Sequence, residues 1–381
     1  MLTFASTATL QSAPLAMKSM TTLHPVLKVL RNEGCCSYLV GCPVSREALL
    51  IDPKAGQENL VRYYLDCYGL NLKGVVDTHT HADHLSASTR FAGPDLPLWM
   101  SQHTQVRRVK NGLEHGQTLS VGELRFKVLE VPGHTPDSIA LFGHGVVFTG
   151  DSLFIDGLAR ADFYGSDPAQ LFDSVQHELL SLPEDTLVFP GHDYSDFLFS
   201  TLDCEMHHNP ALRHASGAAY AQSLQTKEGA GNSPAVAAML ALNLEESPEL
   251  PDSPMNAAAC CASPSLREEE EAVLEVSLAE LADAHAKLRD AEEWVDVRDP
   301  HEWHHGRIPN TSSIPLSELG FHLAQLRKRD SLFLSCRTGV RSVTAAKTLR
   351  RLGVVQKPIN VQGGIIGWQS QKLPIEGLPS N

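Results

Sequence analysis

The chain has 381 residues, 42% hydrophobic and 20% charged, with a formal net charge of -14. At this length one hydrophobic core usually gives way to two domains. The acidic balance without a basic cluster excludes nucleic acid and anionic membrane as expected partners, and no apolar run reaches transmembrane length.

Residues 1–19 form an expected leader. The segment has one Lys, no acidic residue and many Ser, Thr and Ala, as transit peptides do, but it has no Arg. A disordered leader with Met20 as an alternative start fits at least as well, so organellar targeting stays open. Eight cysteines without a CxxC pair do not form a disulfide framework, so we expect a reducing compartment, the cytoplasm.

From about Leu27 to Phe189, β-like runs alternate with helical stretches, a pattern that predicts sheets covered by helices. The runs cover residues 37–40, 49–51, 75–76, 126–131, 146–148 and 187–189, and the clearest helical stretch covers residues 59–68. We expect these elements to form a first domain over residues 20–262.

A domain boundary is expected near residues 245–264, which carry four prolines and no clear period. We place a flexible linker at 263–276 and a second domain at 277–381. Ser277-Leu278-Ala279-Glu280 has the form of a capping box and predicts a helix to about Arg289. Strands over 294–297 and 332–335 and a helix over 342–352 complete a second α/β pattern.

His79-Thr80-His81-Ala82-Asp83-His84 places four potential metal ligands within six residues, directly after an apolar run. Imidazoles and carboxylates held this close are costly to bury unless a cation or a hydrogen-bond network satisfies them. His134, Asp151 and His192 each follow a further β-like run, at the point where the run passes into a loop. Four such transitions favour a metal site over a coincidental surface cluster.

The spacing of this set resembles the ligand signature of the metallo-β-lactamase superfamily, over nearly all of residues 24–200. The set is His79, His81, Asp83, His84, His134, Asp151 and His192. The resemblance implies an αββα sandwich. It leaves metal and reaction open, because the same seven positions hold two zinc ions for hydrolysis or one iron for oxygen chemistry.

Within that superfamily the chain resembles the persulfide dioxygenases. The resemblance rests on HADH at 81–84, PGHTP at 132–136, TGD at 149–151, RADF at 160–163 and HDY at 192–194. Glyoxalase II-like hydrolases usually carry an aromatic residue at the position of Asp162, and they end in a basic helical region that residues 213–243 do not match. The resemblance implies one Fe(II) per chain on His79, His134 and Asp151, with dioxygen as co-substrate.

The same resemblance assigns roles around this triad. It leaves His81, Asp83, His84 and His192 as supporting groups or as ligands of a vacant second metal site. Tyr194 is placed beside the iron as an orienting hydroxyl, and Arg160 near the substrate carboxylate; the alternative for each is an ordinary core or surface contact. The chain has Ala161 where Thr is common and Ala211 where a basic residue is common, and Arg213 is expected to compensate for the second loss.

Cys336-Arg337-Thr338-Gly339-Val340-Arg341 lies between an expected strand and an expected helix, where loop amides and a helix N-terminus can hold an anion. A cysteine phosphatase loop is excluded, because it requires Arg where Ser342 stands. The loop resembles the active loop of rhodaneses, within a likeness that covers 277–378. This implies an α/β rhodanese domain with Cys336 as nucleophile and Arg337 and Arg341 as catalytic cations. The other seven cysteines are expected to be buried apolar residues or surface thiols.

These patterns together predict iron-dependent oxidation of a low-molecular-weight persulfide, such as glutathione persulfide, to sulfite and thiol. We expect it to be coupled to sulfur transfer between thiosulfate or sulfite and a glutathione-like thiol through a persulfide of Cys336. One alternative is a binuclear zinc, glyoxalase II-like thioester hydrolase with a rhodanese appendage; another is a C-terminal domain that only carries sulfur or docks a partner. The direction of sulfur transfer and the oligomeric state, a homo-oligomer included, stay open.

Overall fold

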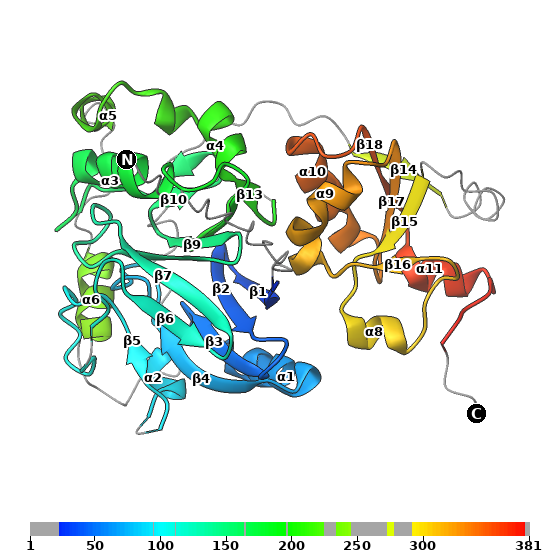
Figure 1. The fold of residues 1–381 in the computed structure, drawn as a ribbon, viewed down its shortest axis with the longest axis horizontal. Coiled ribbons are helices and arrows are strands. Elements are labelled where there is room, and N and C mark those ends of the chain that lie inside the picture. The colour runs from blue at the N-terminus through cyan, green and yellow to red at the C-terminus, as the bar shows by residue number, and fades with distance from the viewer. Residues whose placement is uncertain are drawn as a thin grey trace, which may run out of the picture.

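The computed structural model describes residues 23–93, 95–110, 112–163, 165–195, 197–224, 234–244, 273–277 and 292–377. Figure 1 shows two bodies, one coloured blue to green and one yellow to red. The expected leader, residues 263–272 of the expected linker and nearly all of the expected helix at 277–289 lie outside the described residues. Within the described part of the chain, no helix is long and apolar enough to cross a membrane.

The first body contains a five-stranded sheet in the order β1-β2-β3-β4-β5. Its strands are β1 (Val26–Asn32), β2 (Cys35–Gly41), β3 (Glu47–Ile51), β4 (Asn71–Val76) and β5 (Leu98–Trp99). Strands β3 and β4 pair in parallel, so the chain must cross over between them, and α1 (Glu58–Tyr68) makes that crossover. Val61 of α1 packs on Leu30, Leu50 and Val75, which covers the outer face of this sheet. The short α2 (Ser88–Phe91) follows β4.

A six-stranded sheet in the order β13-β12-β9-β8-β7-β6 lies against the first. Its strands are β6 (Thr118–Val121), β7 (Leu124–Glu130), β8 (Ile139–Gly143), β9 (Val146–Gly150), β12 (Leu187–Pro190) and β13 (Ser200–Thr201). Helix α3 (Pro168–Ser174) starts at Asp167, whose carboxylate accepts from two early amides, and continues into the π-helix η1 (Val175–Leu179). Both cover the outer face, where Leu171 and Val175 pack on Val147 and Val188.

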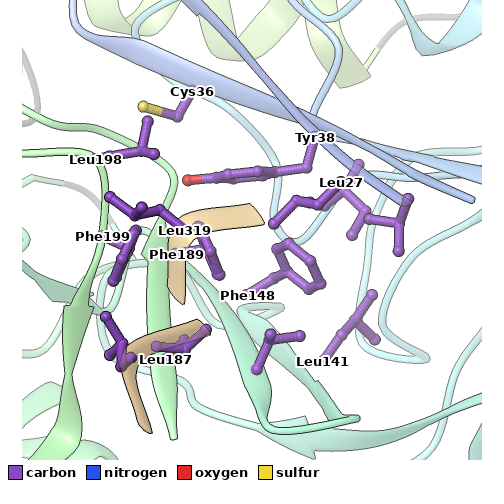
Figure 2. Close-up of a cluster of buried hydrophobic side chains, with 14 of the residues drawn as sticks. Leu27, Cys36, Tyr38, Leu141, Phe148, Leu187, Phe189, Leu198, Phe199 and Leu319 are labelled. Atoms are coloured by element: carbon purple, nitrogen blue, oxygen red, sulfur yellow. The ribbon is translucent and has the colours of Figure 1, made fainter. Parts of the chain in front are cut away.

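The remaining elements of the first body lie around the six-stranded sheet (Figure 1). They are the hairpin β10 (Leu153–Phe154) and β11 (Gly157–Leu158), followed by α4 (Leu202–His208), η2 (Pro210–Arg213), α5 (Gly217–Leu224) and α6 (Pro234–Leu244). Between the two sheets lies one apolar core, in which Tyr38 of the first sheet packs on Phe148 and Phe189 of the second (Figure 2). The layers are therefore helix, sheet, sheet, helix, which confirms the predicted αββα sandwich.

The second body has a five-stranded parallel sheet in the order β14-β18-β17-β15-β16. Its elements are β14 (Leu274–Val276), β15 (Glu292–Asp296), α8 (Pro300–His304), β16 (Ser312–Ser313), η3 (Leu316–His322), α9 (Leu323–Leu326), β17 (Ser331–Ser335), α10 (Val340–Arg351), β18 (Lys357–Val361) and α11 (Gly364–Ser370). Helices α10 and α11 lie on opposite faces of this sheet (Figure 1), which confirms the predicted α/β class. Strand β14 falls inside the range expected as linker, so the sheet begins before residue 277.

The two bodies share buried apolar contacts. Leu319 of η3 joins the core of the first body near Leu187 and Phe199 (Figure 2). Gly320 permits this close approach, because a Cβ there would lie 2.5 Å from a methyl carbon of Leu187. Arg351 of α10 pairs with Asp156 and with Glu205 across the same contact. The packed contact between the two bodies therefore sets their separation, rather than the length of a flexible linker.

One buried ion pair lies within this contact. The Nζ of Lys28 on β1 lies 2.5 Å from an Oδ1 oxygen of Asp299, which begins α8, and the Lys28 side chain is only 4% exposed. The ammonium lies 4.6 Å from the centre of the Tyr68 ring, and the Tyr68 hydroxyl donates to Asp299 at 3.2 Å. A buried charge must keep its partner, so the contact depends on both members of the pair.

We expect Lys28→Met to lower the free energy of unfolding by about 2 kcal/mol, because the Asp299 carboxylate then loses its cation and keeps two neutral donors, the Tyr68 hydroxyl and the Glu302 backbone amide. Urea unfolding of the full chain measures this. Lys73→Met is the matched control: its partner Glu47 lies 3.4 Å away at the surface, and the expected change is below about 0.5 kcal/mol. Equal effects of the two substitutions would contradict this role of Lys28.

Candidate metal centre and cysteine loop

The predicted metal ligands all follow strands of the sandwich. The segment from His79 to His84 comes after β4, His134 after β7, Asp151 directly after β9, and His192 after β12. All of the predicted ligand side chains are buried, with exposures between 1% and 8%. The structure thus brings together at one edge of the sandwich residues that lie far apart in the sequence.

The three predicted iron ligands form one group. The Nε2 atoms of His79 and His134 lie 3.9 and 3.6 Å from the same oxygen, Oδ2 of Asp151. Each of these three atoms is buried and has no hydrogen-bond partner among the described residues. Buried polar atoms almost always have a hydrogen-bond partner. Two imidazole nitrogens and one carboxylate oxygen without such a partner, close to one another, are therefore suited to coordinate a cation.

The surroundings of the group keep its ligands in the form that binds metal. Burial lowers the pKa of His79 and of His134, so both rings are neutral near pH 7. The Nδ1 of His134 donates to the carbonyl of Arg160 at 2.7 Å, which leaves Nε2 free to coordinate. Burial opposes ionisation of Asp151, yet the His192 imidazole holds the pKa of this carboxyl well below its ordinary value. Gly150, the residue before Asp151, has a φ of 51°, and a Cβ there would lie 2.4 Å from the Thr78 hydroxyl, so this position requires glycine.

The other four predicted ligands separate into two sets. His81 lies with Asp52 and Asp77, whose carboxylates are 3.5 and 3.9 Å from its Nε2 and raise its pKa although burial opposes the charged form. Asp83 accepts from His84 at 3.0 Å and from His192 at 2.9 Å through the same Oδ2 atom. His81 therefore belongs to a different charge network from the other three residues.

Cys35 is buried, as one of the two expected alternatives has it, but it lies beside the polar residues Asp83, His84 and His192. Its Sγ lies 3.7 Å from Oδ2 of Asp83 and 3.8 Å from Nδ1 of His84. Burial opposes ionisation, yet hydrogen bonds to His192 and His84 lower the pKa of the Cys35 thiol to about 6. The sequence signal was the adjacent pair Cys35-Cys36 at the start of a strand, because alternation places the two thiols on opposite faces.

The predicted substrate residues differ in their surroundings. Tyr194 stacks on the His192 ring at 5.8 Å, which places it beside the metal ligands, and its orienting role stays a prediction. Arg160 is held by Asp162 at 2.5 Å, and its Nη2 is buried without a partner in the described part of the chain. Arg213 ends η2 and is exposed, so solvent screens its charge.

The cysteine loop joins β17 to α10 as predicted. Cys336 is buried, the Gly339 amide donates to its Sγ at 3.1 Å, and the Ser342 hydroxyl lies 3.4 Å from the same sulfur. Of the two predicted cations, Arg337 is exposed, whereas Arg341 donates to both oxygens of Glu302 at 2.7 and 2.8 Å. The catalytic role of these arginines stays a prediction, and the structure shows that Arg341 also binds a carboxylate of α8.

Comparisons with known proteins agree with this geometry. Residues 89–192 match the family described as Metallo-beta-lactamase superfamily, and residues 278–371 match the Rhodanese-like domain. The persulfide dioxygenase ETHE1, mitochondrial, of Homo sapiens is 36% identical over 180 residues, which cover 46% of this chain and 70% of that protein. A hydroxyacylglutathione hydrolase of Xanthomonas euvesicatoria is 39% identical over 150 residues, which cover 39% of this chain and 57% of that protein.

A solved structure gives the same result. The crystal structure of ETHE1 from Myxococcus xanthus matches with a TM-score of 0.54 at 32% identity, over 57% of this chain and 98% of that chain. The chain therefore belongs to the metallo-β-lactamase superfamily, as a homologue of the ETHE1 persulfide dioxygenases that carries a rhodanese-like domain after its metallo-β-lactamase domain.

Proposed function

We propose that the first body oxidises a low-molecular-weight persulfide, glutathione persulfide in the first instance, at one Fe(II) held by His79, His134 and Asp151. One persulfide RSSH, one dioxygen and one water give one thiol RSH, one sulfite and two protons. The observation that carries this proposal is the set of three unsatisfied, buried donor atoms, two imidazole and one carboxylate. Two histidines and one carboxylate form the ligand set of non-haem iron oxygenases. Iron supplies the redox chemistry with dioxygen that zinc lacks.

The residues around the triad bind and orient the substrate. The free Nη2 of Arg160 is suited to a substrate carboxylate, since Asp162 fixes the guanidinium and the Arg160 carbonyl holds His134. The Phe163 ring packs edge-on against His134 at 5.0 Å and keeps water from that side of the imidazole. Arg213 adds a second, exposed positive charge for the thiol carrier, and Tyr194 orients the persulfide beside His192.

For the second body we propose sulfur transfer through Cys336. The Cys336 sulfur attacks the outer sulfur of thiosulfate, a persulfide forms on Cys336, and sulfite leaves. A thiol such as glutathione then takes the outer sulfur, which restores Cys336 and gives a thiol persulfide. The support is the Gly339 amide and the Ser342 hydroxyl beside Sγ, which stabilise negative charge on sulfur. The thiol persulfide is the substrate proposed for the first body.

A binuclear zinc thioester hydrolase is the second candidate for the first body. Two observations favour it: the hydroxyacylglutathione hydrolase relative, and the grouping of Asp83, His84 and His192 beside the triad. Metal analysis of the purified chain separates the two candidates. Iron near one per chain with persulfide-dependent oxygen uptake supports the dioxygenase, and two zinc ions per chain with thioester hydrolysis support the hydrolase.

We expect Asp151→Ala to lose iron and persulfide-dependent oxygen uptake, because it removes the only carboxylate of the triad, and to keep thiosulfate turnover. Iron analysis, an oxygen electrode and a thiosulfate assay measure these quantities. Asp203→Ala is the control, since Asp203 lies on the surface of α4 beside His207 at 3.2 Å. Retention of iron and of normal oxygen uptake by Asp151→Ala would refute the assignment of the triad.

We expect Cys336→Ser to lower thiosulfate turnover at least ~100-fold, because a serine hydroxyl cannot form a persulfide. Oxygen uptake with preformed glutathione persulfide should persist in the folded variant. Cys67→Ser is the control, since Cys67 is exposed on α1, and it should leave thiosulfate turnover at its normal value. If preformed persulfide no longer supports oxygen uptake in Cys336→Ser, the two proposed steps are not separate.

We expect Arg160→Met to raise KM for glutathione persulfide about 10- to 100-fold with a smaller change in kcat, as for a lost hydrogen bond to a charged group. Arg213→Met should raise KM less, because solvent screens the exposed guanidinium. Oxygen-uptake kinetics over a range of persulfide concentrations measure both. A larger effect at Arg213 than at Arg160 would assign the carboxylate to the exposed arginine instead.

A further inference from the structure

We propose that Asn360 and Glu275 are positioning residues for the sulfur of Cys336. Asn360 accepts the hydrogen bond of the Ser342 hydroxyl while the sulfur is neutral, and the hydroxyl turns to the sulfur when the sulfur becomes negative. Glu275 fixes the side-chain amide of Asn360 in the orientation that this requires. The inference rests on the proposed sulfur transfer, and it adds to that site two residues outside the cysteine loop, one on β18 and one on β14.

Three buried side chains form a continuous row behind the cysteine loop. Cys336, Ser342 and Asn360 are 1%, 0% and 2% exposed. The Ser342 oxygen lies 3.4 Å from the Cys336 sulfur and 2.7 Å from Oδ1 of Asn360. The row ends at Glu275, the register partner of Asn360 on β14, whose Oε1 lies 2.9 Å from Nδ2 of Asn360. Buried groups linked in this way depend on one another for their hydrogen bonds.

Glu275 determines which way the Asn360 amide faces. Its second oxygen accepts from Nε2 of Gln362 at 2.6 Å, and hydrogen bonds from Gln362 and Asn360 hold the pKa of Glu275 below its ordinary value. The carboxylate is therefore charged near pH 7 and can only accept hydrogen bonds. Asn360 must direct its NH2 group to Glu275, which leaves Oδ1 as an acceptor for Ser342.

The Ser342 hydroxyl has one hydrogen and three acceptors within reach. The distances are 2.7 Å to Oδ1 of Asn360, 3.1 Å to the carbonyl of Gly339 and 3.4 Å to the Cys336 sulfur. Beside a neutral thiol the hydroxyl donates to the amide oxygen, which is the nearest acceptor, and its own oxygen accepts from the thiol. A negative sulfur is the stronger acceptor, because hydrogen bonds to charged groups are stronger than those to neutral ones, so the hydroxyl turns to it.

Negative charge reaches the Cys336 sulfur twice in the proposed transfer. It forms first when the thiol loses its proton to solvent; the thiolate then attacks the outer sulfur of thiosulfate, whose S–S bond breaks with its electron pair on sulfite. It forms again when an acceptor thiolate bonds to the outer sulfur of the persulfide, because the bond to Cys336 breaks and its electron pair stays on Cys336. The turn of the Ser342 hydroxyl stabilises the sulfur at both points, and the hydrogen bond to Asn360 returns when the charge is gone.

Other charged groups around the sulfur come from the loop, from α8 and from the end of the neighbouring strand β15. They are Arg337, Arg341, Glu302 and the pair of Asp296 with Arg298. All of them are kept in the variants below. A change in the pH dependence of the sulfur among these variants therefore reports the hydrogen bonds of Ser342 and Asn360.

The test is the pH dependence of the reaction of Cys336 with iodoacetamide in the full chain, followed by mass spectrometry of the peptide that contains Cys336. Asn360→Val removes the competing acceptor, so the pH of half-maximal rate should fall by about 0.5–1 unit, the equivalent of one hydrogen bond between neutral groups. Ser342→Ala removes the donor, so that pH should rise by about 0.5–1 unit.

Glu275→Gln permits the Asn360 amide to turn, because a glutamine side chain can donate as well as accept. It should therefore shift the profile in the same direction as Asn360→Val. The matched control is Glu376→Gln, since Glu376 is a surface carboxylate of the same body, 3.4 Å from Arg307, and it should leave the profile unchanged. If Asn360→Val does not fold, Glu275→Gln decides, and an unshifted profile in that variant overturns the proposal.

The Ser342→Ala background separates a positioning role from a purely structural one. Because Asn360 and Glu275 act through the hydroxyl, neither Asn360→Val nor Glu275→Gln should shift the profile once the hydroxyl is gone. A shift that persists in that background, or no shift in its presence, would overturn the proposal. Iodoacetamide reacts with Cys336 whether or not the chain turns over thiosulfate, so absence of thiosulfate turnover in the unaltered chain refutes the proposed function and is distinguishable from failure of this inference.

Discussion

Unsatisfied donor atoms buried at one edge of a rigid sandwich are the constraint on which the rest of this structure depends. His79, His134 and Asp151 present three such atoms to a single point, and each comes from the end of a different strand. The apolar core between the sheets holds those strands in register and cannot accept the polar groups itself. A bound cation therefore contributes folding free energy as well as chemistry, because the site is satisfied only when metal is present.

The second constraint is the sharing of ligands between neighbouring groups. His192 links Asp151 of the triad to Asp83, and the Cys35 sulfur lies 3.7 Å from the same Asp83 oxygen. The metal content of one group therefore changes the hydrogen bonds that orient a ligand of the other.

The sequence predicted those parts of the structure that depend on neighbouring residues, such as the alternation of apolar and polar side chains along a strand. Alternating apolar runs placed the strands of both bodies, and the strand-to-loop positions of His134 and Asp151 placed the triad. The position of Cys35 beside Asp83 and His84 was not predicted, because every residue of its strand is buried and the sequence pattern is the same whether the thiol faces the core or these polar side chains. The separation of His81 from the other ligands was also hidden, since it depends on Asp52, which lies on a different loop. Such contacts join residues far apart in the chain and leave no periodicity.

The contact between the two bodies was hidden for the same reason, and it bears on the cysteine loop. Lys28 binds Asp299, which caps α8, and Glu302 on the first turn of α8 holds Arg341 of the loop. Burial raises the pKa of Glu302 but the Arg341 guanidinium outweighs it and lowers that pKa, so the carboxylate is charged and the pair persists near neutral pH. One short helix, α8, thus connects the contact surface of the first body to Arg341 of the cysteine loop. Separation of the C-terminal body from the first would remove the partner of Asp299 and expose Leu319, so the surroundings of α8 in the intact chain differ from those in the separated body.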